Sequence, residues 1–343
     1  MAELERGAAE TTGRTLNAVF FGGGTPSLMD PEVVADVITA IRRHWPTAND
    51  LEVTLEANPG SVEAGRFGAY RQAGVSRVSM GIQALNDADL KRLGRIHTSK
   101  EALAAFDVAR THFDRVSFDL IYGRQTQTLG TWKEELKQAL TLAIDHISLY
   151  QLTVEQGTAF GDRYNRGMLR GLPDDDLGAD MYEATQDICG AAGFPRYEVS
   201  NHARIGSESR HNLIYWRYGD YLGVGPGAHG RMTQSGSKYA TECFSNPARW
   251  LNAAKAGKTE KPRSLLPRSE QATEFLLMGL RLKEGIDLIR YETIAGRALD
   301  AEKMAHLQEI GMIEVNRSRL CVTDQGFIVL NAIIETLLTD PCQ

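Results

Sequence analysis

The chain has few cysteines and places none of them close together. Of its 343 residues four are cysteine, namely Cys189, Cys243, Cys321 and Cys342, and no two of them show the C-x-x-C spacing of a metal site. A chain of this length can bury a core large enough to fold without disulfides or a structural metal. We therefore interpret all four as ordinary cysteines and expect no metal ligands.

Long apolar runs and an excess of positive charge are also missing. No apolar stretch approaches the roughly 18 residues that a membrane-spanning helix needs, and the N-terminus lacks the charged-then-apolar pattern of a secretory signal. The net charge is −6, which argues against a nucleic-acid partner, because such a partner favours a basic surface. These absences predict a cytoplasmic protein without a membrane span.

What the sequence does contain, over its first two-thirds, is an alternation of strand and helix patterns. Short apolar segments predict strands at residues 16–21, 51–55, 75–80, 116–121 and 147–152, and helical periodicity separates them at residues 31–44, 62–72, 100–110 and 131–142. Such an alternation predicts an α/β fold with a parallel sheet, and a complete or partial (β/α) barrel is the leading architecture. An open doubly wound sheet is the alternative, because periodicity alone does not show closure.

Each predicted strand ends in a polar or glycine-rich cluster. These clusters occupy residues 22–26, 56–59, 81–83, 119–123 and 150–153. In a barrel the carboxyl ends of the strands converge on one face, where such enzymes do their chemistry. The five clusters together therefore predict a ligand site at that face.

The last third predicts a different, mostly helical region. A helical pattern at residues 174–192 precedes this region, whose own helical patterns cover residues 247–258, 269–283, 287–295, 301–310 and 324–337, and a strand pair is expected at residues 313–315 and 319–322. The final helix-helix-hairpin-helix order is winged-helix-like. Because this chain is acidic and has no basic recognition helix, we favour a packing role over nucleic-acid binding.

Individual residues at the strand ends are of types that can bind a small polar ligand. The triplet Gly22–Gly24 lets a ligand approach the main chain closely, although a tight turn explains three glycines equally well. The carboxylates of Glu56 and Asp119 suit ribose hydroxyls or an amine. Arg95 can pair with a ligand carboxylate. Each of these residues, taken singly, has an equally good structural explanation.

Several motifs occur in the order found in one protein family. They are FFGGGTPS at residues 20–27, EANPG at 56–60, GIQ at 81–83, DLIYG at 119–123 and YEVSN at 197–201. In this order and spacing the chain resembles radical S-adenosylmethionine proteins related to oxygen-independent coproporphyrinogen oxidase. The segments RHNLIYW at 210–216 and YLGVGPGAH at 221–229 resemble the HemW branch, the heme chaperones. The resemblance covers nearly the whole chain.

The resemblance implies two sets of binding residues and no catalytic side chain. The positions that it implies for S-adenosylmethionine are Gly23, Gly24, Thr25, Glu56, Gln83, Arg95 and Asp119. The positions that it implies for heme are His211, Asn212, Tyr215 and Trp216. Histidine is a standard axial ligand of heme iron, and aromatic side chains supply flat apolar faces with polar tips.

The family also carries a C-x-x-x-C-x-x-C segment, whose thiolates bind a [4Fe–4S] cluster just after the first barrel strand. This sequence begins in what resembles the helix after that strand, without the strand or the three cysteines. We expect that the start was chosen too far downstream, so that the full-length form holds the cluster. A cluster-less relative is the alternative. Either way, the strand at residues 16–21 is expected at a sheet edge.

The resemblance implies three domains: a radical S-adenosylmethionine barrel core at residues 1–205, lacking its first strand, a heme-motif extension at 206–260 and a HemW-type C-terminal domain at 261–343. It implies a heme chaperone that passes heme to acceptor proteins, helped in the full-length form by S-adenosylmethionine and the cluster. Peripheral contact with membrane heme proteins is a further expectation. The alternatives are a coproporphyrinogen III oxidase, which decarboxylates propionates by radical chemistry in porphyrin biosynthesis, and an inert or merely binding scaffold.

Overall fold

The protein folds into two compact units, as seen in a computed structural model that describes residues 1–61, 64–157 and 159–338. Unit 1 consists of Met1–Asn17, Val37–Leu51 and Arg210–Gln343, and unit 2 consists of Ala18–Asp36 and Glu52–Ser209. The sheet that carries the predicted strand ends has most of its residues in unit 2.

This sheet has six strands in the order β1-β2-β3-β4-β5-β6. The strands are β1 (Leu16–Phe21), β2 (Thr47–Ala57), β3 (Arg77–Gln83), β4 (Arg115–Tyr122), β5 (His146–Gln151) and β6 (Asn201–Ala203). The order follows the chain without the reversal that defines a doubly wound sheet, and β1 and β6 stand at its two ends rather than closing on each other. The prediction of an α/β fold with a partial barrel is therefore confirmed, with β1 at an edge.

One strand departs from the predicted parallel arrangement. Strands β2 to β5 pair in parallel, but β6 pairs antiparallel to β5. The reason lies just before β6, where the amide of Tyr197 donates to the carbonyl of Asn201 at 3.1 Å and an antiparallel bridge joins Arg196 to His202. The chain thus turns back tightly between the preceding helix, α8 (Asp175–Ala191), and β6, so that β6 enters the sheet in the opposite direction to β5.

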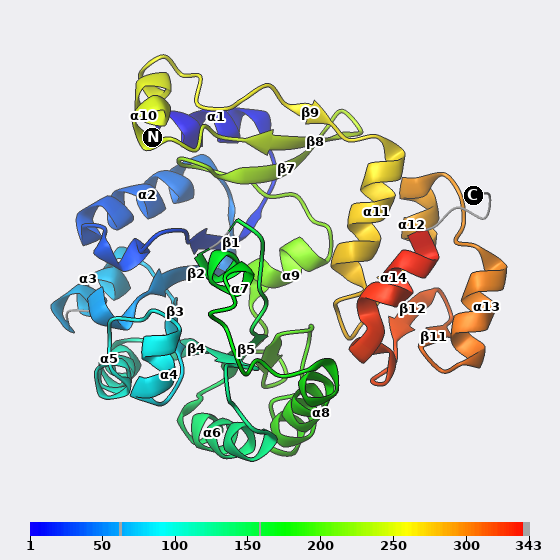
Figure 1. The fold of residues 1–343 in the computed structure, drawn as a ribbon. Coiled ribbons are helices and arrows are strands. Elements are labelled where there is room, and N and C mark those ends of the chain that lie inside the picture. Colours follow the sequence, from blue (N-terminus) through cyan, green and yellow to red (C-terminus); the bar gives the residue numbers. More distant parts are fainter. Residues whose placement is uncertain (62–63, 158, 339–343) are drawn as a thin grey trace. The chain divides into compact units, whose positions relative to one another are not determined.

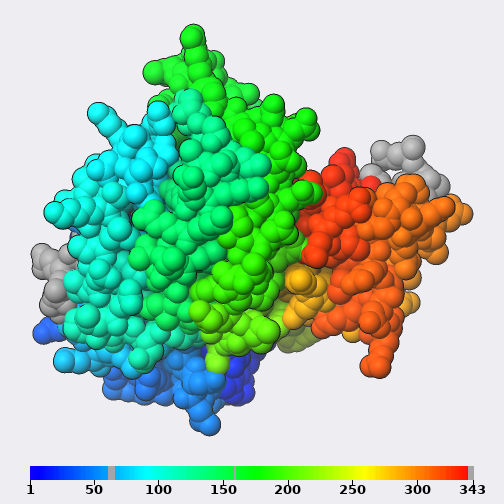
Figure 2. Space-filling view, turned by 90° about the horizontal axis from the view of Figure 1, so that it is seen from below, coloured from blue at the N-terminus to red at the C-terminus, as the bar shows by residue number. Residues whose placement is uncertain are grey.

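Helices cover the outer side of the strands of unit 2 (Figure 1). They are α2 (Pro31–His44), which unit 2 shares with unit 1, α3 (Ala64–Ala73), α4 (Asp87–Arg92), α5 (Ser99–His112), α6 (Leu129–Leu142) and α8 (Asp175–Ala191). Helix α7 (Ala159–Asn165) is instead drawn over the middle of the strands in this view, and the short 3-10 helices η1 (Pro26–Leu28) and η2 (Pro59–Ser61) follow β1 and β2. Figure 2 shows the surface of this layer from cyan to green, with successive segments side by side in chain order. The first residues of the helix predicted at 62–72 lie outside the described residues.

Local signals explain where these helices begin. Thr98 and Glu101 form a reciprocal capping box at the start of α5, and Asp174 accepts a hydrogen bond from the amide of Leu177 at the start of α8. Helix α5 buries residues three and four apart, among them Phe106, as expected of an amphipathic helix lying on a sheet.

The two faces of the unit 2 sheet differ in polarity. Along β4 the buried Val116, Phe118 and Leu120 share one face, whereas Ser117 and Asp119 share the other. Purely parallel sheets normally bury apolar side chains on both faces. The polar inner face therefore marks the interior of the partial barrel as a place for chemistry rather than for packing alone.

Unit 1 contains a three-stranded antiparallel sheet in the order β7-β8-β9. Its elements include α1 (Ala2–Glu10), α9 (Arg210–Trp216), β7 (His229–Gln234), β8 (Ser237–Glu242), α10 (Pro247–Lys255) and β9 (Ser264–Leu265). The β7–β8 hairpin was not predicted. Its turn has positive φ at both Ser235 and Gly236, +48° and +80°, which is the two-residue geometry that suits a hairpin.

The C-terminal part of unit 1 confirms the predicted winged-helix-like arrangement. It contains α11 (Arg268–Gly279), β10 (Ile286–Asp287), α12 (Leu288–Ala295), α13 (Ala301–Glu309), β11 (Ile313–Asn316), β12 (Arg319–Val322), η3 (Gly326–Val329) and α14 (Leu330–Leu338). The strands form a sheet in the order β10-β12-β11. The helix predicted at residues 324–337 is divided into η3 and α14.

Candidate functional site

The loop after β1 and the end of β2 meet at the first two predicted positions. The amide of Gly23 donates to Oε2 of Glu56 at 3.2 Å. Gly23 and Gly24 have φ values of +81° and +60°, which favour glycine, and a Cβ built on either residue would meet nothing within 4 Å. Thr25 follows directly, half-buried before η1. The main chain here is open to a ligand, as the glycine motif predicts.

The end of β3 brings together a second predicted pair. Gln83 follows a register shift between Met80 and Gln83 and has a φ of +75°, a strained value for a residue with a side chain. Its Oε1 accepts a hydrogen bond from Nη2 of Arg95 at 3.2 Å. Arg95 is exposed in the turn after α4, so its remaining donors can face a ligand.

Asp119 lies on the inner face of β4, beside Ser148 of β5 in the parallel register. Burial raises the pKa of Asp119 to about 7, and the negative charge of Glu56 adds to this shift. Burial also raises the pKa of Glu56. Because Asp119 and Glu56 repel each other when both are ionised, ionisation of one disfavours ionisation of the other. The pair therefore holds a proton for part of the time at neutral pH.

The predicted heme positions all lie on α9, a helix of seven residues in unit 1. His211, Asn212, Tyr215 and Trp216 are half-buried. The rings of His211 and Tyr215, one helical turn apart, have centroids 6.2 Å apart and meet edge to face. The guanidinium of Arg281 lies over the Trp216 ring, 4.5 Å from its centroid.

Both ends of α9 are tied to other parts of unit 1. At its start, Nη1 of Arg210 donates to the carbonyl of Asp50 at 2.9 Å, and the guanidinium also pairs with the Asp50 carboxylate. This pairing lowers the pKa of Asp50 to about 2. After its end, Arg217 forms a two-pronged pair with Glu284, with both contacts at 2.8 Å.

One polar atom of α9 is buried without a partner. Among the described residues, Nε1 of Trp216 has no hydrogen-bond acceptor. A buried indole N–H normally finds an acceptor, because leaving it unpaired costs free energy. A ligand with a carboxylate beside α9 would satisfy it.

The cysteines do not assemble a metal site. Burial raises the pKa of Cys189 and of Cys243 to about 12, and Cys321 is half-buried with a raised pKa as well. Across residues 1–61, 64–157 and 159–338, no group of three His, Cys, Asp or Glu side chains could hold a metal ion. Cys342 lies outside the described residues. The described part of the chain contains no helix that could serve as a membrane span.

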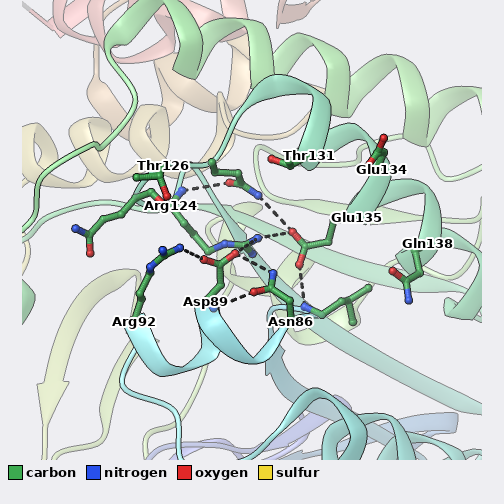
Figure 3. Close-up of a pocket in the computed structure, with 12 residues that line it drawn as sticks. Asn86, Asp89, Arg92, Arg124, Thr126, Thr131, Glu134, Glu135 and Gln138 are labelled. Atoms are coloured by element: carbon green, nitrogen blue, oxygen red, sulfur yellow. Dashed lines mark hydrogen bonds and ion pairs between the residues drawn. The ribbon is translucent and has the colours of Figure 1, made fainter.

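A polar pocket of about 350 Å³ lies elsewhere in unit 2, between α4, the loop after β4 and α6. Figure 3 shows that its charged groups pair with one another: the buried guanidinium of Arg124 bonds to Asp89 at 3.0 Å and to Glu135, and Arg92 also pairs with Asp89. None of the predicted site residues lines this pocket. Its charges are already compensated, so it offers less to a ligand than the strand ends do.

Three polar residues of the inner face are not among the predicted site residues. Glu198 is fully buried, and its Oε1 accepts from the amide of Ser200 at 2.9 Å and from Nδ2 of Asn201 at 2.5 Å. Asn201 Oδ1 in turn accepts from Ser148 Oγ at 2.8 Å. The YEVSN motif offered a sequence signal for these residues, because it places a glutamate and an asparagine three residues apart in a turn. Only the structure shows that the asparagine also bonds to Ser148 on β5.

Comparisons with known proteins show the family of the chain. The radical SAM superfamily matches residues 1–139, and the HemN C-terminal domain matches residues 266–329. The "Heme chaperone HemW" of Haemophilus influenzae is 37% identical over 99% of this chain and 87% of that protein. HemW of Escherichia coli is 34% identical over 98% of this chain and 88% of the relative. A bovine mitochondrial protein, "Radical S-adenosyl methionine domain-containing protein 1", is 38% identical over 95% of this chain and 76% of its own length.

A solved structure shows the same fold. Coproporphyrinogen III oxidase (HemN) from Escherichia coli, described as a radical SAM enzyme, matches with a TM-score of 0.79 over 98% of this chain and 81% of that chain. The sequence identity is 20%, so this likeness concerns the fold alone.

Proposed function

This chain belongs to the HemW family of radical S-adenosylmethionine proteins, and from that premise we propose that it is a heme chaperone, which binds heme and passes it to acceptor proteins. The proposal is supported by relatives at 34–37% identity that span nearly the whole chain and are named heme chaperones. The likeness to the oxidase gives the fold without the activity, so the chaperone is favoured over coproporphyrinogen oxidation.

The observation that carries this proposal is helix α9. His211 supplies an imidazole, the usual axial ligand of heme iron. Tyr215 supplies an aromatic face one turn away, and the unpartnered N–H of Trp216 suits a heme propionate. Arg210 and Arg217 fasten the two ends of the helix. We assign heme binding to His211, Asn212, Tyr215 and Trp216.

The strand ends of unit 2 fit S-adenosylmethionine, and the fit rests on the open main chain at Gly23 and Gly24. We propose that Gly23, Gly24 and Thr25 contact the methionine part through the main chain. Carboxyl groups suit the ammonium and ribose hydroxyls of this molecule, and a guanidinium suits its carboxylate. When bound, S-adenosylmethionine supplies an adenosyl and a methionyl moiety. The remaining proposed contacts are Glu56, Gln83, Arg95 and Asp119.

The described residues do not fit the iron–sulfur cluster that the radical SAM family implies. Such a cluster needs several thiolates together, and Cys189, Cys243 and Cys321 form no such group. Cluster binding by cysteines outside this sequence therefore stays a prediction. The domain boundaries at residues 205 and 260, the cytoplasmic location and contact with membrane heme proteins also stay predictions.

Heme titration of the whole chain, followed by the Soret band, tests the proposal. We expect saturable binding, and we expect His211→Ala to weaken it at least about tenfold, which corresponds to about 1.4 kcal/mol. His306→Ala is a matched control, because His306 is an exposed histidine on another helix, α13. Unchanged affinity in His211→Ala, with the same unfolding midpoint, would remove the assignment of heme to α9.

A further inference from the structure

The segment between β3 and α5 begins and ends at two residues of the predicted ligand site. It leaves the sheet at Gln83, forms α4 and returns at Arg95, whose Nη2 donates to Oε1 of Gln83 at 3.2 Å. The turn after α4 shapes this return, because the amide of Arg95 donates to the carbonyl of Leu90 at 2.8 Å and Gly94 has a φ of +75°. The two site residues thus close one loop, residues 83–95, and its placement decides where the Arg95 guanidinium lies.

This loop needs contacts from outside to hold its position. Helix α4 has six residues, and a helix this short is unstable without tertiary contacts. Its buried side chain is Leu90, but apolar burial is not directional and does not fix how a helix is turned. Gln83 has a φ of +75°, a strained value that persists only where the surrounding contacts enforce it. Directed contacts are therefore required at the loop.

The first directed contact comes from a buried carboxylate on α6. Oε1 of Glu135 accepts from the amide of Leu85 at 2.8 Å, and Leu85 lies two residues after Gln83. Its Oε2 accepts from Nη2 of Arg124 and, at 3.3 Å, from Nε2 of Gln127. Hydrogen bonds fix direction as well as distance. The start of the loop is thereby tied to α6.

The second directed contact joins Arg124, which follows β4, to α4 (Figure 3). Its buried Nη2 also lies 3.0 Å from Oδ2 of Asp89, and its Nη1 donates to the carbonyl of Ile121 at 2.7 Å. A guanidinium is planar and presents its donors in a fixed fork. Arg124 therefore holds α4, α6 and the end of β4 in one geometry.

We propose that Arg124 and Glu135 are positioning residues, which hold the loop so that the remaining donors of the Arg95 guanidinium face a ligand carboxylate. Arg95 binds that carboxylate, and Gln83 fixes one edge of the guanidinium. The paired charges of the polar pocket thus support the strand-end site instead of forming a second site. The ligand is S-adenosylmethionine in this account, so its identity rests on the proposed function.

The first test compares the affinity of the whole chain for S-adenosylmethionine with its affinity for the decarboxylated form, which lacks only the carboxylate. We expect wild type to prefer S-adenosylmethionine, and we expect Arg124→Lys to lower this preference at least about fivefold, because lysine keeps the charge but loses the fork. Arg124→Met should lower it further. Calorimetric titration measures both affinities. An equal loss of affinity for the two ligands would show a merely structural role and overturn the proposal, as would an unchanged preference in both variants.

Thr185→Ala is the matched control for lost stability. The Thr185 hydroxyl on α8 accepts from Nε1 of the buried Trp132 at 2.8 Å, and Trp132 lies on α6, as Glu135 does. Leaving this N–H unpaired destabilises the same layer of helices but keeps the bonds of Glu135. The ligand preference should stay within about twofold of wild type. A fall equal to that in Arg124→Lys would overturn the proposal.

Hydrogen exchange of the Arg95 amide in the ligand-free chain separates this inference from the function on which it rests. We expect this amide to exchange at least about tenfold faster in Arg124→Met than in Thr185→Ala, because α4 and its last turn form only while tertiary contacts hold them. Faster exchange without S-adenosylmethionine binding, in wild type or variants, keeps the positioning role and rejects the ligand. A lowered ligand preference without faster exchange rejects the positioning role and keeps the ligand.

Discussion

The strand-end site of unit 2 and helix α9 of unit 1 are built in opposite ways. The first collects single residues from positions 23 to 119, held by main-chain turns, strand register and buried pairs. The second places its four residues within one helix and fastens only the two ends. In a site collected from several strands and loops, the binding side chains also make contacts that stabilise the fold. The side chains of a site within one helix can be changed with little effect on the stability of the other elements. Substitutions in the two regions should therefore differ in how much stability they remove.

The largest loss of stability is expected from a buried ion pair that joins β2 to the starts of β3 and β4. Glu52 and Arg77 are both buried and 3.6 Å apart, and Arg115 also pairs with Glu52 at 3.0 Å. Glu52→Ala leaves a buried guanidinium without its compensating charge, which should lower the free energy of unfolding by about 3–5 kcal/mol. Urea denaturation measures this change. Glu134→Ala, at an exposed glutamate, should stay within about 0.5 kcal/mol of wild type.

Removing one charge from the strand-end site should mainly affect ligand binding there. Glu56→Gln keeps an acceptor for the Gly23 amide but loses the negative charge. Because hydrogen bonds to charged groups contribute about 1.5–3 kcal/mol, we expect S-adenosylmethionine affinity to fall roughly 10- to 150-fold. Calorimetric titration measures this fall. An equal loss of heme affinity in the same variant would show that the two regions do not act separately.

Helix α9 offers the reverse case, a change that should weaken binding without weakening the fold. Trp216→Phe keeps an aromatic face but removes the buried N–H that has no partner among the described residues. We expect the free energy of unfolding to stay unchanged or to rise by about 1 kcal/mol, and heme affinity to fall about fivefold. A clear loss of stability with normal heme binding would instead assign Trp216 to packing.

The pH dependence of stability should have opposite signs in the two regions. Asp119 has a pKa raised to about 7, so its burial costs stability increasingly as pH rises from about 4 to 7, and Asp119→Asn should gain relative stability over that window. Asp50, which pairs with Arg210, has a pKa lowered to about 2, so its contribution is complete above about pH 4 and is lost as pH falls through 2. Asp50→Asn should therefore lose relative stability above pH 4. Thermal unfolding across pH measures both, and equal signs would contradict this account.

The same contrast explains how much could be predicted from sequence. The strands and most helices were predicted within a few residues, because apolar periodicity and caps such as Asp174 are local signals. The positions of Glu56 and Asp119 at strand ends followed from the same pattern. The antiparallel β6 and the β7–β8 hairpin were missed, because they depend on turn geometry at Tyr197 and Ser235.

The hydrogen bonds of the inner face could not be predicted at all. Glu198 and Ser148 are 50 positions apart in the sequence, and no periodicity links a turn to a neighbouring strand. Strand register alone brings Ser148 beside both Asn201 and Asp119. Likewise, the motif around His211 predicted the binding residues of α9, but only the structure shows that Arg210 and Arg217 link the two ends of this helix to Asp50 and Glu284.

The central claim, that the chain hands heme to other proteins, is tested most directly by the kinetics of transfer. The chain is loaded with heme and mixed with increasing concentrations of an apo heme protein, and the Soret change is followed in time. A chaperone that hands over heme by contact predicts a transfer rate that rises with acceptor concentration. A rate that is independent of acceptor concentration would mean simple heme dissociation, and it would contradict the proposed function.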